Sequence, residues 1–315
     1  MSCLYERNQF CDILSIMGRA YSFLFLFWFL SLTNLFAQHN KLKISDIDKL
    51  DAKGWSLRKT FPDSTLYYTD LIIDILKEDG DTSSIAKYYN YKGIAYYYKG
   101  DNYTSFNYYM LAYEQALALG DSVQYGHSMN NLGRFFLSQG NYIKSYAYYD
   151  DALAIFKLLN NKDGIAYSLK RISEVYMAQG YFLKALYTYK EALHIRLDHF
   201  DKNTQATAHI DIANVYFELD SLSQSQLQYL SAYRKANEMG NEVLVAISQL
   251  GLSEINLKRS AYDSAIQYAQ KAKETALNMH NVDLLSQVLI QLGKSFYYAQ
   301  QMEKAEAEFE TILLI

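Results

Sequence analysis

Residues 172–185 read ISEVYMAQGYFLKA, and residues 252–265 read LSEINLKRSAYDSA. The two stretches align without a gap at an offset of 80 residues. Halving that offset recovers a longer array with a small residue at every fortieth position: Gly93, Gly133, Ser173, Ala213, Ser253 and Gly293. A fixed period of about 20–50 residues is typical of stacked supersecondary units.

Further columns of residues keep the same register. A second small column stands twelve positions after the first: Ser105, Ser145, Ala185, Ser225, Ala265 and Ala305. A mainly aromatic column follows four positions later: Tyr109, Tyr149, Tyr189, Tyr229, Ala269 and Phe309. Spacings of three, four and seven residues put such positions on one stripe of a helix. Turn residues separate the two helical patterns, as at Gly140 and Gly180. Each unit is therefore predicted to be a helix, a tight turn and a second antiparallel helix.

Small residues let two helix backbones approach closely, and the aromatic column then fills the wedge between one hairpin and the next. A lone hairpin cannot bury that face, so the units must stack. The single proline and the 14 glycines of this 315-residue chain agree with a mostly helical fold. The pattern predicts an all-α solenoid.

The array resembles the tetratricopeptide repeat, which has small residues at its eighth, twentieth and twenty-seventh places. The resemblance implies a right-handed superhelix of stacked helix pairs, with units at 86–125, 126–165, 166–205, 206–245, 246–285 and 286–315. The period exceeds the common one of about 34 residues and looks like that of a forty-residue subclass. A degenerate capping repeat is expected over 44–81, where Pro62 begins a second helix. Because residues 311–315 give the array an apolar finish, we expect a truncated sequence or a further element.

The N-terminus has the pattern of an export signal. One arginine at 19 precedes an apolar run over 21–32, and a small residue, Ala37, precedes the polar Gln38. We expect a signal peptide at 1–37 and a location in the periplasm or on the extracytoplasmic face of a bacterial membrane. An uncleaved anchor and a start at Met17 are the alternatives, although the run is shorter than the roughly 20 residues of a membrane span.

Composition excludes several classes of function. Both cysteines, Cys3 and Cys11, lie before the apolar run, so the processed chain would have no disulfide, thiolate metal site or cysteine nucleophile. The net charge of −4 argues against nucleic acid as a partner. His194 and Asp198 stand one helical turn apart, but no third ligand completes a metal site. No motif of a catalytic site is present, so we expect neither an enzyme nor a cofactor.

The resemblance also implies a peptide-binding or protein-binding groove. In that family the second, fifth, sixth, ninth, twelfth and thirteenth places of each unit face the groove. On this register the predicted contact residues are Tyr91, Tyr97, Tyr98, Asn130, Asn131, Arg134, Tyr167, Lys170, Arg171, Glu174, Asn214, Phe217, Tyr297 and Tyr298.

The middle of this predicted groove is rich in amides and cations. The residues Asn130, Asn131, Arg134, Lys170 and Arg171 have the chemistry to hold a carboxylate or the backbone carbonyls of an extended peptide. The alternative is an ordinary charged helix surface on which Glu174 and Asp211 pair with these cations.

The prediction for function is an exported, non-catalytic module that binds a protein, a peptide or its own downstream domains. It resembles the extracytoplasmic input modules of bacterial signalling proteins of the histidine kinase or helix-turn-helix regulator type, in which a following segment supplies membrane association. The alternative is a free-standing periplasmic or surface scaffold that assembles an envelope complex.

Overall fold

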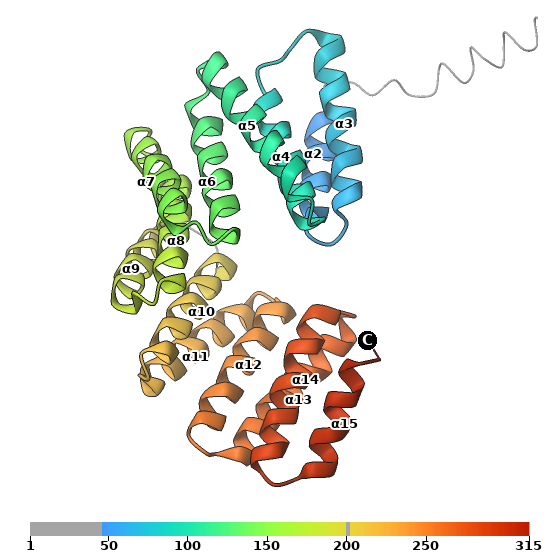
Figure 1. Cartoon of the computed structure of the whole chain (residues 1–315), viewed down its shortest axis with the longest axis vertical. Helices are drawn as coiled ribbons and strands as arrows, with labels where there is room; N and C mark the ends of the chain where they lie inside the picture. The colour runs from blue at the N-terminus through green and yellow to red at the C-terminus, as the bar shows by residue number, and fades with distance from the viewer. Residues whose placement is uncertain (1–45, 200–201, 315) are drawn as a thin grey trace, which may run out of the picture. The chain divides into compact units, whose positions relative to one another are not determined.

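The computed structural model describes residues 46–199 and 202–314. The chain divides into two compact units, Met1–Thr82 and Ser83–Ile315, and each is described by itself. All regular secondary structure in the described residues is helical (Figure 1). The predicted all-α solenoid of helix pairs is confirmed.

The described part of the first unit is one helix pair. Helix α2 (Ile47–Leu57) packs against α3 (Pro62–Asp79). The proline stands at the first position of α3, where its missing N–H costs no hydrogen bond. The hydroxyl of Thr65 donates to the carbonyl of Gly54 over 2.9 Å and joins the two helices.

The second unit contains six consecutive helix pairs, which we call pairs 1–6. They are α4 (Ile85–Tyr98) with α5 (Asn102–Leu119), α6 (Ser122–Ser138) with α7 (Tyr142–Leu158), α8 (Lys162–Ala178) with α9 (Phe182–His199), α10 (Lys202–Glu218) with α11 (Leu222–Glu238), α12 (Glu242–Lys258) with α13 (Tyr262–Asn278), and α14 (Val282–Tyr298) with α15 (Met302–Ile312). From α6 onward, each first helix begins 40 residues after the previous one, and from α5 onward so does each second helix. The predicted unit starts, such as 126 and 166, fall four residues inside the first helices.

The helices end at residues with a left-handed backbone. These lie at every twentieth position of the described array from 100 to 300: Gly100, Gly120, Gly140, Asn160, Gly180, Asp220, Gly240, Ser260, His280 and Gln300. A residue in this conformation satisfies carbonyls at the end of a helix and reverses the chain. Most of the following helices begin at an Asp or Asn that accepts a backbone N–H, as Asn141 does from Lys144 over 3.1 Å. One turn geometry thus serves both within and between pairs.

The two small columns meet inside each pair. The Ser105 hydroxyl donates to the Gly93 carbonyl over 2.8 Å, and the Ser145 hydroxyl donates to the Gly133 carbonyl over the same distance. Pairs 4 and 5 have the same contact between residues twelve apart. The small column therefore provides both close helix approach and a buried hydrogen bond.

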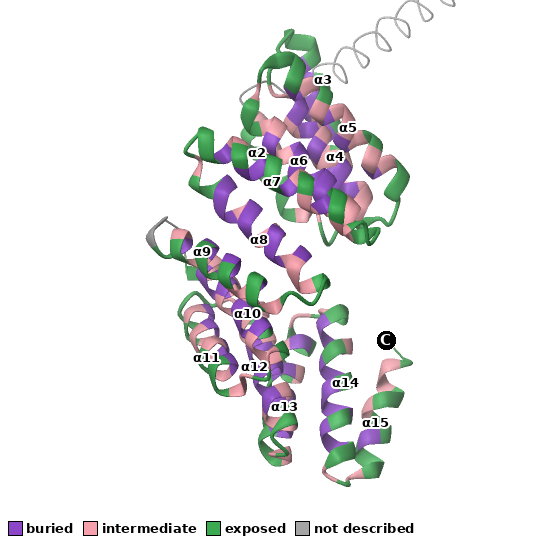
Figure 2. Ribbon diagram, turned by 60° about the vertical axis from the view of Figure 1, so that its left-hand side comes forward, coloured by how far each residue is buried: buried purple, intermediate pink, exposed green. Residues whose placement is uncertain are grey.

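Large side chains fill the space beside these small residues. The rings of Tyr109 and Tyr149 are completely buried, and the ring of Tyr149 lies against Gly133 in its own pair. Phe156 of α7 is also completely buried and lies against Gly126 of α6 and Gly164 of α8, so it joins pairs 2 and 3. Figure 2 shows the buried residues as stripes along the helices, for example on α14.

The predicted signal segment, 1–37, lies outside the described residues. Among the helices that the structure does describe, none combines the length and apolarity of a membrane span. In the same residues no group of three or more histidine, cysteine and carboxylate side chains is placed to hold a metal ion. The side chains of Asp198 and His199 are outside the described set.

Candidate functional site

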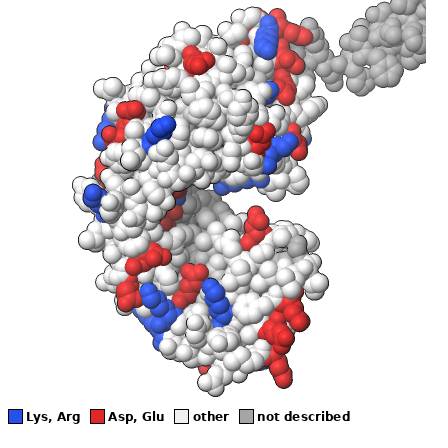
Figure 3. Space-filling model, in the orientation of Figure 1, with Lys and Arg blue, Asp and Glu red and all other residues white. Residues whose placement is uncertain are grey.

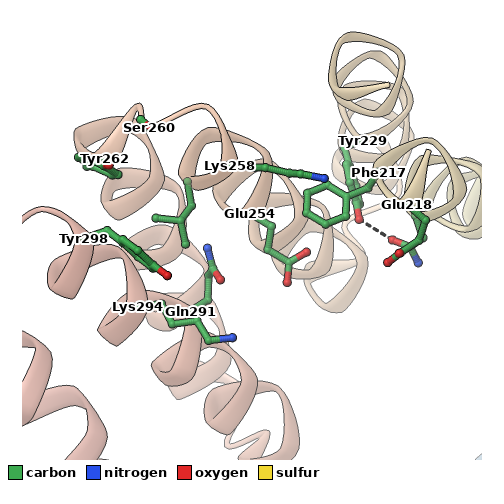
Figure 4. Close-up of a pocket in the computed structure, with 12 residues that line it drawn as sticks. Phe217, Glu218, Tyr229, Glu254, Lys258, Ser260, Tyr262, Gln291, Lys294 and Tyr298 are labelled. Atoms are coloured by element: carbon green, nitrogen blue, oxygen red, sulfur yellow. Dashed lines mark hydrogen bonds between the residues drawn. The ribbon is translucent and has the colours of Figure 1, made fainter. Parts of the chain in front are cut away.

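A pocket opens along the first helices of pairs 4, 5 and 6. It has a volume of about 610 Å³ and lies between α10, α12 and α14, with contributions from α11 and α13 (Figure 4). The lining residues are Asn214, Phe217, Glu218, Tyr229, Glu254, Leu257, Lys258, Ser260, Tyr262, Gln291, Lys294 and Tyr298.

The forty-residue register explains why these side chains meet. Asn214, Glu254 and Lys294 are 40 residues apart and occupy the same turn of three successive first helices. Glu218, Lys258 and Tyr298 form a second such row four residues later. Because side chains four apart lie on one face of a helix, the two rows line one continuous wall.

The charges of the pocket are mixed and partly buried. Burial raises the pKa of the Glu254 carboxyl, the nearby Lys294 opposes that rise, and Glu218 adds to it. Lys258 pairs with Asp220 over 2.9 Å and lies 4.8 Å from the ring centre of Phe217. A half-buried carboxylate with a raised pKa in a concave site is a feature of binding sites.

Aromatic and amide groups complete the lining. The hydroxyl of Tyr229 donates to the side-chain oxygen of Asn214, which fixes the orientation of that amide. The rings of Tyr262 and Tyr298 stack at 6.5 Å with an angle of 15° between their planes. The site therefore offers hydrogen-bonding, charged and flat apolar surfaces within one pocket.

A sequence model described as the tetratricopeptide repeat matches residues 84–158 and, in a second overlapping match, residues 126–198. The matched segments cover pairs 1–3, whose small and aromatic columns continue through pair 6. The chain contains tetratricopeptide repeats. An array of such repeats is a protein-interaction module.

Solved structures with the same fold include other repeat proteins. The tetratricopeptide-repeat sensor protein of Pyrococcus horikoshii, a signal transduction ATPase with numerous domains, is 15% identical with a TM-score of 0.67. The match covers 81% of this chain and 39% of that one. The aspartyl phosphate phosphatase F of Bacillus subtilis is 15% identical with a TM-score of 0.62, over 83% of this chain and 68% of that one.

A Rap protein complexed with competence and sporulation factor is 12% identical with a TM-score of 0.64, and the match covers 90% of each chain. At these identities the likeness concerns the fold. No curated protein matches the chain.

The tetratricopeptide register predicted part of the pocket. Asn214, Phe217 and Tyr298 were expected to face the groove, and all three line the pocket. The predicted contact residues did not include any from pair 5. The same ninth, twelfth and thirteenth places in the unit that starts at 246 are Glu254, Leu257 and Lys258, so extending the register would have found them.

Two predicted contact residues are instead part of the packing between repeats. Asn130 and Asn131 are 1% and 6% exposed. The Asn130 amide donates to the Ser168 hydroxyl of the next repeat over 3.0 Å, and the Asn131 amide donates to Asn90 of the previous repeat over 2.9 Å. Because these amides already have buried partners, their assignment to an open ligand surface is corrected.

The predicted charged residues of repeats 2 and 3 lie in a separate cluster from the pocket. Lys170 pairs with Asp211, and Arg171 donates to Glu174 over 2.7 Å, as the alternative interpretation expected. Arg134 donates to the hydroxyl of Tyr109 over 2.6 Å. The ion pairs therefore use part of the predicted cationic set and leave Arg134 without a carboxylate among the described side chains.

The predicted tyrosines divide into two groups. Tyr97 and Tyr98 lie beside Arg134, and Tyr167 lies beside Arg171 with its ring centre 4.7 Å from the guanidinium carbon. Tyr91 is half-buried and contacts Tyr88 edge to face. At the other end of the array, Tyr297 is 54% exposed and contacts the pocket residue Tyr298.

Proposed function

We propose that this chain is an exported, non-catalytic module that holds an extended segment of a protein or peptide in the pocket of pairs 4–6. It would serve as the sensory input of a bacterial signal-transduction protein. The bound segment belongs either to a separate polypeptide or to downstream domains of the same protein.

The observation that carries the proposal is the row Asn214, Glu254 and Lys294 inside a pocket of about 610 Å³. An acceptor and donor amide, a carboxylate and an ammonium group follow one another on three parallel helices. Such a row matches the alternating donors and acceptors of an extended backbone. The flat surfaces of Phe217 and Tyr298 beside it suit apolar side chains of the same segment.

The sensory part of the proposal has two supports. The fold occurs in a tetratricopeptide-repeat sensor protein for signal transduction and in a Rap protein complexed with competence and sporulation factor. The N-terminal sequence has the charge, apolar run and small residue of an export signal. A sensor of extracellular peptides or envelope proteins requires both binding and export.

Peptide selection tests the pocket. Immobilised protein is panned with a phage library of random twelve-residue peptides, and the enriched peptides are measured by fluorescence anisotropy. Lys294→Glu is expected to weaken their affinity about tenfold, because it places a second carboxylate beside Glu254. Lys271→Glu makes the same charge change at an exposed position of α13 outside the pocket and serves as the control. Equal affinities for both variants would exclude the pocket as the binding site.

Export is tested separately by expressing residues 1–315 with a C-terminal tag in a Gram-negative host. The tagged protein is expected in the periplasmic fraction with Gln38 as its first residue, measured by intact mass. Leu26→Arg interrupts the apolar run and should retain the protein in the cytoplasm. An unprocessed chain in the membrane fraction would favour the anchor, and an unprocessed soluble chain in the cytoplasm would contradict export.

A further inference from the structure

Six charged side chains gather on the first helices of pairs 2–4 and on α9, outside the pocket. They are Arg134, Lys170, Arg171, Glu174, Arg196 and Asp211. Lys170 contacts both carboxylates, since it pairs with Asp211 and lies 3.7 Å from Glu174. Arg171 donates to the other oxygen of Glu174 over 2.7 Å. The two carboxylates are thus already shared between Lys170 and Arg171.

The cluster carries more positive than negative charge. It has four cations and two carboxylates, and neither Arg134 nor Arg196 forms an ion pair with a carboxylate in the described part of the chain. Arg196 is only 7% exposed, and its burial lowers the pKa of the guanidinium. Buried charge without a counter-ion is costly. The folded protein therefore retains an electrostatic demand for an anion at this place.

Unused hydrogen-bond donors lie in the same cluster. The Nε atoms of Arg134, Arg171 and Arg196 are buried without a partner, and so is the hydroxyl of Tyr149. Tyr149 is within electrostatic reach of both Arg134 and Arg171. Native structures leave few buried polar atoms unpaired, so four in one cluster indicate a missing polar partner.

Two of the arginines remain accessible from outside. The side chain of Arg171 is 19% exposed, and Arg134 is half-buried. The ring of Tyr97 lies 4.6 Å from the guanidinium carbon of Arg134, and the ring of Tyr167 lies 4.7 Å from that of Arg171. A ring against the flat face of a guanidinium leaves its N–H donors in the plane free to meet a carboxylate.

We infer that Arg134 and Arg171 bind one carboxylate group of the peptide segment, either its C-terminal carboxylate or an Asp or Glu side chain. This inference rests on the proposed function for the identity of the ligand, because it assigns the charge of the segment that the pocket holds. Arg134 stands at the same ninth place of its repeat as Asn214, Glu254 and Lys294. An extended segment that follows this row of first helices meets the two arginines on its way along repeats 2 and 3.

The pairing also explains which predicted residues take no part. Asn130 and Asn131 are committed to contacts between repeats, and Lys170 is neutralised by Asp211. Arg196 contributes through its charge from behind the surface. The binding atoms are thus limited to the N–H groups of two arginines with different surroundings.

Nuclear magnetic resonance of the arginine Nε–Hε groups tests the inference without any selected peptide. The ¹⁵N-labelled protein is titrated with three blocked tripeptides at millimolar concentrations. One carries a glutamate side chain and a C-terminal amide (Ac-Ala-Glu-Ala-NH₂), one carries only a free C-terminal carboxylate (Ac-Ala-Ala-Ala-OH), and one carries neither (Ac-Ala-Ala-Ala-NH₂). Arg134→Lys and Arg171→Lys each remove one signal and so assign the spectrum.

At least one carboxylate peptide is expected to shift the Arg134 and Arg171 signals in a saturable way, and the neutral peptide is expected to leave them in place. The tighter of the two carboxylate peptides identifies the source of the group. Arg234, which is exposed on α11, is the internal control and should not shift. Arg134→Gln should weaken the affinity about tenfold at the remaining Arg171 signal.

Equal shifts with the neutral peptide, or no shift with either carboxylate peptide, would overturn the inference. The readout does not involve Lys294 or the other pocket residues. A failed peptide selection at the pocket and a failed titration at the arginines are therefore separate results.

Discussion

Replacing Phe156 with alanine is expected to lower the free energy of unfolding by about 3–5 kcal/mol. The ring is completely buried, and its atoms lie against Gly126 of α6 and Gly164 of α8. The imidazole of His127 also lies beside it, with 5.2 Å between the ring centres. Truncation would leave a cavity between pairs 2 and 3, and the two glycines have no side chains that could move into it.

Urea unfolding followed by far-UV circular dichroism measures this loss. The control is Leu158→Ala, because Leu158 is on the same helix and 88% exposed. The control should change the free energy of unfolding by less than about 0.5 kcal/mol. Because repeats contact only their neighbours, amide hydrogen exchange in Phe156→Ala should increase most in α6, α7 and α8. A loss equal to that of the control would mean that Phe156 does not hold the two pairs together.

Replacing Gly133 with leucine is expected to destabilise the array by about 1–3 kcal/mol through overpacking. A Cβ atom at this position would lie only 2.7 Å from the ring of Tyr149. That ring is completely buried and has little room to move. The better helix propensity of leucine, worth up to about 1 kcal/mol relative to glycine, acts in the opposite direction and does not offset the clash.

A double-mutant cycle with Tyr149→Ala separates the clash from other effects of the leucine. Removal of the ring should make room for the new side chain, so the double variant should lose less stability than the sum of the two single variants. Ala147→Leu adds the same side chain at an exposed position of α7 and should be nearly neutral. Additive losses in the cycle would show that Gly133 is required for a reason other than contact with Tyr149.

Much of the fold could be predicted from the columns of small and large residues. Gly133 and Ser145 were expected to permit close approach, and in the structure they meet between α6 and α7. The hydrogen bond from the serine hydroxyl to the glycine carbonyl was not predicted, because alanine occupies the same column in other repeats. Size alone therefore predicted the contact, and only coordinates revealed its polar component.

The candidate site could be predicted less completely. The groove register placed Asn214 and Asn130 on equivalent faces, yet Asn214 lines the pocket and Asn130 is buried against Ser168. The difference depends on the neighbouring repeat, since a serine two places into the next unit offers a partner to the fifth position. A single register cannot separate such cases, because burial depends on the side chains of two repeats together.

The left-handed residues at every twentieth position have a consequence for how such arrays change in length. Each one ends a helix and introduces the next with the same backbone geometry, whether it lies within a repeat or between repeats. A recombination event that joins two of these positions 40 residues apart, such as Asp220 and Ser260, removes or duplicates one whole hairpin and interrupts no helix. The chain can thus gain or lose groove length in steps of one repeat while every remaining turn keeps its conformation.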